Sequence, residues 1–375
     1  MKSKHIVFFT LISLVVSIAL NACRKGFDSP QPLDDCISDI NENATPYLLN
    51  IPPFFPPMDI PSCNPLTVEG IELGRHLFWD KMLSGDNTMS CGTCHIPSSN
   101  FSDPEQYSMG ITGEVGNRQA MPLINLGWSP EFFWDGRAHS LEEQVVGPVA
   151  NPIEMNQDWD ELLQELQAAD KYPQMYKDAF GSPVVTKART AKALASFLRT
   201  MISAESKFDK QRIGQYTFTE SEERGLDLFL KEGGDPANGL GGQFGADCFH
   251  CHGFGVMLTT DNLPHNNGLD ATFEDLGYGG VTGNALDMGK FRTPTLRNIE
   301  FSAPYMHDGR FATLEEVIEH YNSGGVASAT IDPFMKYTSG GLELSAQDKE
   351  DLIAFLLCFS DTTFMSNPAF QAPDE

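Results

Sequence analysis

The residues most able to do chemistry in this sequence stand in two short cysteine–histidine motifs. Residues 91–95 read Cys-Gly-Thr-Cys-His, and residues 248–252 read Cys-Phe-His-Cys-His. This spacing is typical of c-type haem attachment, because two thiols bond to the two vinyl groups of one haem and the adjacent histidine reaches the iron. The repeated motif therefore predicts two covalently bound haem c groups. The attachment residues and proximal ligands are Cys91, Cys94 and His95 for the first haem and Cys248, Cys251 and His252 for the second.

The sequence after the first motif predicts an open coordination site on one iron. No histidine occurs between His95 and His139, so this loop supplies no obvious second imidazole. Met109 is the one methionine between Cys94 and Met121, and we interpret it as an exposed loop residue. An open iron binds small ligands such as peroxide, whereas an iron with six ligands transfers electrons. The alternative is a dihaem electron carrier without catalysis, in which both irons are six-coordinate at rest.

The segments that must hold these motifs are mostly helical by pattern. A capping box stands at residues 140–143, and residues 96–138 and 253–300 have the composition of long loops. No segment shows convincing strand alternation, so we expect a mainly α fold. Apolar residues at helical spacing predict helices that start near Thr67 and that span residues 158–169, 187–208, 219–230, 313–322 and 345–359.

The chain follows one plan twice, with a helix, a haem motif, a long loop and further helices in each half. Each unit has about 140 residues, which suits a helical domain built around one haem. We expect two cytochrome c-like domains packed across an interface that carries the haems. The expected divisions are residues 66–213 for the N-terminal domain, 214–360 for the C-terminal domain, 23–65 for a tether with a Pro-rich arm and 361–375 for a tail.

The first residues have the pattern of an export signal. Two lysines precede a short apolar run, and the segment that ends at Cys23 resembles a bacterial lipoprotein cleavage box. We therefore expect residues 1–22 to be removed and Cys23 to carry lipid, which tethers a periplasmic protein to the cell envelope without a membrane span. Ordinary signal cleavage, with Cys23 left as a thiol, is the alternative. Export permits disulfides, and Cys36 with Cys63 is the first pair to test.

The composition limits the partners of the protein. Acidic residues outnumber basic ones, 51 to 25, and the formal net charge is −26. This acidity argues against nucleic acid and against an anionic membrane surface as partners, and it favours a basic partner such as a small electron carrier. The alternative is that the acidity only keeps an exported protein soluble.

Several longer motifs carry a resemblance to a known family. They are Phe-Trp-Asp-Gly-Arg at 133–137, Leu-Glu-Glu-Gln at 141–144, Gly-Pro at 147–148, Asn-Pro-Ile-Glu-Met at 151–155, Phe-Arg-Thr-Pro-Thr-Leu-Arg-Asn at 291–298 and Ala-Pro-Tyr-Met-His-Asp-Gly at 303–309. With these motifs the chain resembles the bacterial dihaem cytochrome c peroxidases and the related MauG enzymes over roughly residues 65–360.

The resemblance implies a haem peroxidase that reduces hydrogen peroxide. Its electrons come from an external periplasmic donor, such as a small c-type cytochrome or a copper protein. The alternative is a MauG-like enzyme, which uses peroxide to oxidise a protein side chain or another substrate. Peroxidases of this kind often form homodimers.

The resemblance also implies roles for three residues near the peroxide-binding haem. Trp134 resembles the tryptophan between the two haems, where it assists electron transfer; core packing is its alternative role. Glu154 resembles the distal carboxylate, which can move a proton between the two peroxide oxygens when burial raises its pKa. A helix-cap carboxylate is the alternative for Glu154. Gln144 resembles the neutral polar partner in the same site.

The second haem separates two branches of the family. The usual peroxidases place an axial methionine fourteen residues after the histidine of the Pro-Tyr-x-His motif, and that position, counted from His307, is Tyr321. MauG-type enzymes also have tyrosine there, and a phenolate ligand lowers the iron potential relative to methionine. His320 is adjacent but points about 100° away on a helix, and a packed helix residue is the alternative for Tyr321. MauG has a tryptophan at the position of Ala246, so the same protein substrate is not expected.

A calcium ion between the two domains is the last feature that the resemblance implies. Gln119, Ser302 and Pro304 fall where the family binds this ion. The family usually has Asn and Thr at the first two positions. Backbone carbonyl ligands would tolerate these two changes better than side-chain ligands would.

Overall fold

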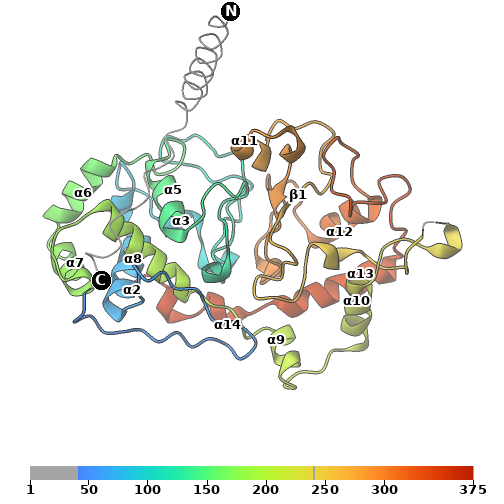
Figure 1. Cartoon of the computed structure of the whole chain (residues 1–375), viewed down its shortest axis with the longest axis horizontal. Helices are drawn as coiled ribbons and strands as arrows, with labels where there is room; N and C mark the ends of the chain where they lie inside the picture. Colours follow the sequence, from blue (N-terminus) through green and yellow to red (C-terminus); the bar gives the residue numbers. More distant parts are fainter. Residues whose placement is uncertain (1–40, 240, 375) are drawn as a thin grey trace, which may run out of the picture. The chain divides into compact units, whose positions relative to one another are not determined.

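The computed structural model describes residues 41–239 and 241–374, and Figure 1 shows their path. These residues belong to one compact unit, Asp39–Glu375. The predicted signal peptide, the lipidation site Cys23 and the proposed disulfide partner Cys36 lie outside the described residues. Cys63, which the structure describes, forms a disulfide. Within the described ranges, no helix combines the length and the apolar character that a membrane crossing requires.

Helices dominate the first half of the described chain. Thr67 caps the first of them, because its hydroxyl accepts a hydrogen bond from the backbone N–H of Gly70. The helices are α2 (Val68–Trp79), α3 (Cys91–Cys94), α4 (Leu141–Gln144), α5 (Val146–Ala150), α6 (Trp159–Ala168), α7 (Tyr172–Phe180) and α8 (Lys187–Thr200). Short 3-10 turns lie at Lys81–Leu83, Pro97–Ser99 and Leu126–Trp128.

The second half has a similar order of elements and adds a small sheet. Its helices are α9 (Lys207–Arg212), α10 (Glu220–Leu230), α11 (Tyr278–Thr282), α12 (Leu314–Ser323), α13 (Ala346–Leu356) and α14 (Thr362–Met365). Short 3-10 turns lie at Pro236–Asn238, Cys248–His250, Ala285–Asp287, Ile299–Phe301, Leu357–Phe359 and Pro368–Phe370. β1 (Pro264–His265) pairs antiparallel with β2 (Phe291–Arg292), so that Pro264 lies opposite Arg292 and His265 opposite Phe291.

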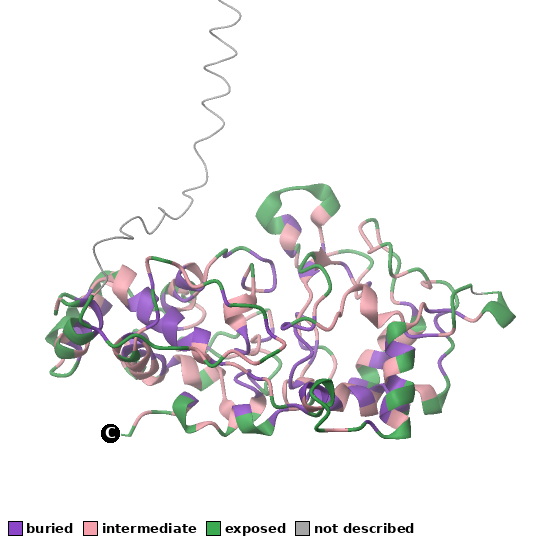
Figure 2. Ribbon diagram, turned by 60° about the horizontal axis from the view of Figure 1, so that its bottom comes forward, coloured by how far each residue is buried: buried purple, intermediate pink, exposed green. Residues whose placement is uncertain are grey.

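Two hydrophobic clusters form the core, and buried residues gather where the helices face one another (Figure 2). The first cluster contains the buried faces of α2, α7 and α8, and the second contains those of α10 and α13. Phe364 and Phe370, from the expected tail, belong to the first cluster. The end of the chain therefore packs against the N-terminal half. The division of the chain near residue 213 stays a prediction.

In each half, the helix before the haem motif crosses a later helix at a glycine. A Cβ atom at Gly74 in α2 would lie 1.9 Å from the carbonyl oxygen of Ala193 in α8. A Cβ atom at Gly225 in α10 would lie 2.0 Å from the carbonyl oxygen of Asp351 in α13. Only glycine permits so close an approach of two backbones. Each haem motif is therefore held beside a tightly crossed pair of helices.

The mainly α fold is confirmed, and one predicted helix is wrong in its second part. The helix predicted over residues 187–208 ends at Thr200, and the chain becomes helical again only in α9. In between, the carboxylate of Asp361 accepts hydrogen bonds from the hydroxyl of Ser203 and from the backbone N–H groups of the next two residues. Ser206 then starts a new capping box. These N–H groups bind a distant side chain instead of continuing the helix. The sequence pattern also did not predict α7.

Candidate functional site

The first haem motif lines a cavity in the N-terminal half. Cys91, Cys94 and His95 all lie in its wall. The Nδ1 atom of His95 lies 2.8 Å from the carbonyl oxygen of Phe101, which leaves Nε2 for an iron. Burial lowers the pKa of His95, so the ring is neutral, as an iron ligand must be. Two thiols and a neutral imidazole in one wall fit a c-type haem.

The second haem motif lines a second cavity in the same way. Its wall includes Cys248, Cys251 and His252, and the Nδ1 atom of His252 lies 3.4 Å from the carbonyl oxygen of Leu258. Burial lowers the pKa of His252 to about 4. Leu258 and Phe101 each lie six residues after their histidine, and both have left-handed backbones with φ of 54° and 53°. A strained turn thus directs one carbonyl toward each histidine, and both motifs are built for the same group.

Trp134 stands in the wall that the two cavities share. Its side chain is buried, and its indole N–H donates a hydrogen bond of 2.8 Å to the carbonyl oxygen of Gln119. This position agrees with the expected place of Trp134 between two haems, and its role in electron transfer stays a prediction. The residues that line both cavities are Gln119, Pro122, Trp134, Arg292, Pro294 and Thr295.

Glu154 and Gln144 lie together in the wall of the first cavity. Gln144 ends α4, and Glu154 lies in the loop after α5. The side-chain amide of Asn151 donates a hydrogen bond of 2.7 Å to Glu154 Oε1. Burial raises the pKa of Glu154, although this hydrogen bond and the charge of Arg137 act in the opposite direction. A carboxyl group with a raised pKa beside the cavity of His95 can exchange protons near working pH.

Tyr321 and His320 have different surroundings although they are neighbours on α12. Tyr321 lines the second cavity, and its phenol oxygen accepts a hydrogen bond of 3.2 Å from the side-chain amide of Asn267. The Nε2 atom of His320 instead lies 2.9 Å from the backbone carbonyl oxygen of Asn267. Burial raises the pKa of Tyr321 to about 12. Tyr321 thus lies in the same cavity as His252, whereas His320 is bonded outside its wall. Ala246 also lies in the wall of this cavity.

A stretch of the first half aligns without gaps with a stretch of the second half. Residues 119–150 match residues 292–323 at constant spacing. In the first copy the N–H of Phe132 donates to the carbonyl oxygen of Ala138 at 2.8 Å, and in the second the N–H of Tyr305 donates to that of Phe311 at 2.7 Å. Sequence reasoning missed this repeat. The signal was Asp-Gly-Arg followed by Leu-Glu-Glu, which occurs at 135–143 and again at 308–316.

The two copies exchange backbone hydrogen bonds across the wall between the cavities. In this alignment of the two stretches, which we call the register, Trp134 corresponds to His307 and Gln119 corresponds to Arg292. The N–H of Gln119 donates to the carbonyl oxygen of His307, and the N–H of Arg292 donates to that of Trp134, each at 2.8 Å. The repeated stretches are therefore joined reciprocally, and Trp134 is fixed by both its backbone and its indole N–H.

The same register distinguishes the two cavities. It equates Tyr321 with Pro148, and each of these residues lines the cavity of its own half. A proline side chain has no atom that binds iron, whereas a phenol oxygen can do so. The continuous helix α12 corresponds to α4 and α5 together, which are separated at Val145. Among the described residues that line the first cavity, none is a tyrosine.

The three residues expected at a calcium ion all line the second cavity. The side-chain amide of Gln119 donates hydrogen bonds to the hydroxyl of Ser102 at 2.8 Å and to the carbonyl oxygen of Asp103 at 3.0 Å. The hydroxyl of Ser302 donates to the carbonyl oxygen of Ile299 at 3.4 Å. These side chains are engaged with neighbouring protein groups, so the calcium ion stays a prediction.

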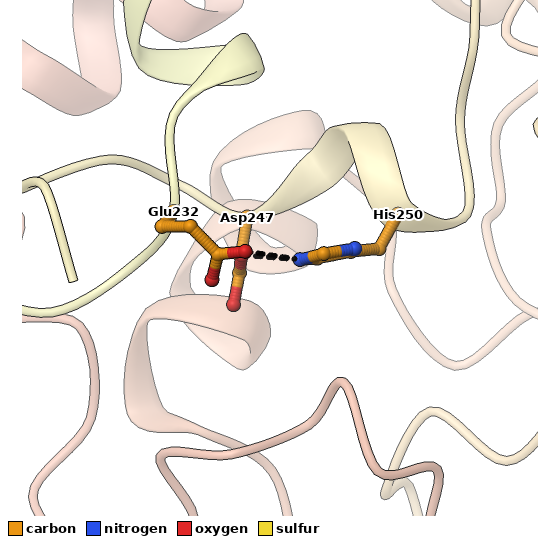
Figure 3. Close-up of side chains that lie close together, drawn as sticks. All are labelled: Glu232, Asp247 and His250. Carbon is orange, nitrogen blue, oxygen red and sulfur yellow. Dashed lines mark hydrogen bonds and ion pairs between the residues drawn. The ribbon is translucent and has the colours of Figure 1, made fainter.

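A charged cluster lies beside the second haem motif, and Figure 3 shows three of its side chains. His250 Nε2 lies 3.1 Å from Glu232 Oε1 and 3.1 Å from Asp247 Oδ1. The ammonium of Lys336 contacts Glu232 and lies 3.6 Å from Asp247 Oδ2. A metal ion held by these groups would have to displace Lys336. The sequence pattern gave His250 no role in haem attachment, and this cluster accounts for its position.

Comparison with known proteins agrees with this geometry. The di-haem cytochrome c peroxidase family matches over residues 68–217. The methylamine utilization protein MauG of Methylorubrum extorquens is 36% identical over 301 residues, which are 79% of this chain and 79% of that protein. The cytochrome-c peroxidase IdrP1 of a Pseudomonas species is 33% identical over 364 residues, 88% of this chain and 89% of that protein.

A solved structure supports the same assignment. It is a MauG-like protein associated with microbial copper homeostasis, with 34% sequence identity and a TM-score of 0.78, and the match covers 87% of this chain and 99% of that one. Two cavities of this kind in a mainly α fold define a dihaem c-type oxidoreductase. The chain belongs to the di-haem cytochrome c peroxidase family, and membership implies two haem c groups.

Proposed function

We propose that the protein is a haem peroxidase that reduces hydrogen peroxide in its first cavity with electrons from an external donor. One observation carries this proposal: the first cavity has Pro148 where the second has Tyr321, and it has Glu154 in its wall. A cavity that offers an open iron and a proton-exchanging carboxyl group suits peroxide, whereas a closed one suits electron transfer. Bound haem supplies an iron that takes peroxide and exchanges single electrons.

Glu154 moves the proton in this proposal. Its carboxylate takes a proton from one peroxide oxygen and returns it to the other, so that the leaving oxygen departs as water. Burial keeps the pKa of this carboxyl above that of an exposed glutamate. The hydrogen bond from Asn151 holds the carboxyl in place, although it acts on the pKa in the opposite direction. Gln144, in the same wall, holds the substrate without competing for the proton. The overall reaction consumes two electrons and two protons for each peroxide and yields two waters.

The electrons enter from a donor outside the chain. The formal charge of −26 supports a donor with a basic surface, such as a small c-type cytochrome or a copper protein. Trp134, in the wall common to both cavities, is our candidate for the connection between the second haem and the first. Tyr321 is our candidate for the outer ligand of the second haem.

A MauG-like oxidation of a protein side chain is the second candidate function. Tyr321 in the second cavity favours it, because the usual peroxidases have methionine there. Ala246 argues against the MauG substrate itself, since alanine cannot carry an electron vacancy as tryptophan can. The two functions share the chemistry of the first cavity and differ only in what is finally oxidised.

We also propose where the protein acts. The export signal and Cys23 support a periplasmic, lipid-tethered protein. The mass of the mature N-terminus would test this, because lipid on Cys23 adds a large, defined increment. We also propose a homodimer, which a measurement of the mass in solution would test. We further propose a calcium ion at Gln119, Ser302 and Pro304, which peroxide turnover before and after chelation would test.

The decisive experiment adds hydrogen peroxide to the purified holoprotein and then offers donors one at a time. Peroxide-dependent oxidation of a cytochrome or copper protein is the expected result. Oxidation of neither, together with modification of another protein, would favour the MauG-like function. An EPR spectrum with two low-spin ferric haems and no high-spin signal, in a protein that ignores peroxide, would leave only an electron carrier.

A further inference from the structure

Asn267 contacts both neighbouring candidates for the outer ligand of the second haem. Its side-chain amide donates a hydrogen bond of 3.2 Å to the phenol oxygen of Tyr321. Its backbone carbonyl oxygen lies 2.9 Å from Nε2 of His320, so that this ring nitrogen donates to it. One residue therefore engages the tyrosine through its side chain and the histidine through its backbone.

The chain around Asn267 is fixed from both sides. It directly follows Asn266, whose carbonyl oxygen accepts a hydrogen bond of 3.0 Å from the N–H of Asp332. The carbonyl oxygen of the next residue, Gly268, accepts one of 2.7 Å from the N–H of Val326. The strand β1, which pairs with β2, ends two residues before Asn267, and Figure 1 labels this strand. Because the backbone is held on each side, the carbonyl and the amide of Asn267 keep their directions.

The side-chain amide of Asn267 favours the phenolate form of Tyr321. A side-chain NH2 group can only donate, so it stabilises the phenol oxygen most when that oxygen is an anion with lone pairs to offer. An iron takes tyrosine as the phenolate, which is such an anion. The same NH2 group also lies 3.4 Å from the sulfur of Met306, a weak acceptor in the same cavity. The stronger acceptor is therefore Tyr321.

We propose that Asn267 is a positioning residue that selects Tyr321 over His320 as the iron ligand of the second haem and sets the potential of that haem. Its carbonyl keeps His320 out of the cavity, and its amide holds the phenol oxygen ready. This inference rests on the proposed ligation by Tyr321. A hydrogen bond to the ligand oxygen draws electron density from it, most strongly in the ferrous state, in which the phenolate keeps more of its negative charge. The bond therefore raises the midpoint potential.

The test uses the holoprotein and two substitutions of Asn267. Asn267→Leu removes the amide at similar size, and Asn267→Ala does so without new bulk. We measure the midpoint potential of the second haem and its low-spin EPR signal. We expect both variants to lower the midpoint potential, by about 59 mV if the equilibrium constant between ferric and ferrous haem changes tenfold. If the phenolate no longer binds the iron, the tyrosinate EPR signal should be replaced by another signal. Asn50→Leu, the same change at an exposed site, is the control.

Tyr321→Phe separates this inference from the proposal beneath it. If Tyr321→Phe changes the potential and the EPR signal while both Asn267 variants keep the wild-type values, Tyr321 is the ligand and the role of Asn267 is refuted. If Tyr321→Phe changes neither, Tyr321 is not the ligand, and the proposed ligation and the role of Asn267 both fail. A change in Tyr321→Phe together with a lower potential or a lost tyrosinate signal in both Asn267 variants supports both. A higher potential in the Asn267 variants with the tyrosinate signal intact refutes the role of Asn267.

Discussion

Tyr321 and Pro148 occupy equivalent positions in the two repeated stretches, and each lines the cavity of its own half. The register follows from Trp134 and His307, which each lie fourteen residues before the paired position and are joined to the opposite stretch by backbone hydrogen bonds. One fold thus supplies a phenol to one cavity and withholds it from the other. At this position the two cavities differ by one side chain, a phenol in the second and a proline ring in the first.

Placing a phenol in the first cavity is expected to close it. In Pro148→Tyr the new side chain should act as Tyr321 does in the second cavity and bind the first iron. If the open fraction falls to about a tenth, the apparent affinity for peroxide falls about tenfold. The EPR spectrum should lose high-spin ferric signal at the same time. Pro152→Tyr, at a nearby exposed proline, should leave both properties unchanged, and equal effects of the two substitutions would contradict the equivalence.

Glu154→Gln removes the proton carrier but keeps the shape of the side chain. Peroxide turnover should fall by a factor on the order of 10² or more, because proton transfer by a positioned side chain contributes about that much. Steady-state turnover with a saturating donor measures it. Glu114→Gln, at an exposed position, is the matched control. Wild-type turnover in Glu154→Gln would remove this residue from the mechanism.

The pKa of Glu154 also predicts the pH profile. Only the ionised carboxylate can accept a proton, and burial raises its pKa, so turnover should fall with decreasing pH at a higher value than an exposed glutamate would give. The hydrogen bond from Asn151 opposes this shift. Asn151→Ala should therefore move the acid limb of kcat/KM to higher pH. A limb that stays in place or moves downward would show that another group titrates.

Tyr321→Met is expected to raise the potential of the second haem. A thioether donates less charge to ferric iron than a phenolate, and axial-ligand identity sets haem potentials over a range of about 0.8 V, so a rise on the order of 100 mV is expected. Potentiometric titration followed by absorption measures it. His320→Gln should change the potential far less, because His320 is bonded to the Asn267 carbonyl outside the cavity wall. A larger effect of His320→Gln would identify the histidine as the ligand.

The sequence predicted the parts of the site that depend on short spacing. The cysteine–histidine motifs and the capped helices follow from residues within one or two turns of one another. The role of Tyr321 came from the family resemblance, through its place fourteen residues after His307. The break after Thr200 could not be predicted, because its cause, the carboxylate of Asp361, is far away in the sequence. The backbone hydrogen bond between Gln119 and His307 could not be predicted either, because backbone hydrogen bonds between distant loops leave no pattern in the sequence.

The ion pair between Arg297 and Asp209 should dominate the polar stability of the C-terminal half. The Arg297 side chain is fully buried, bonds both carboxylate oxygens of Asp209 at 2.9 and 3.0 Å, and donates to the carbonyl oxygen of Val256 at 2.8 Å. Arg297→Ala leaves the Asp209 charge buried without its partner, which should lower the free energy of unfolding by about 3–5 kcal/mol. Lys231→Ala breaks an exposed pair with Asp227 and should cost at most about 1 kcal/mol. Urea unfolding of the two holoproteins measures both, and equal losses would show that the buried pair contributes no more than a surface one.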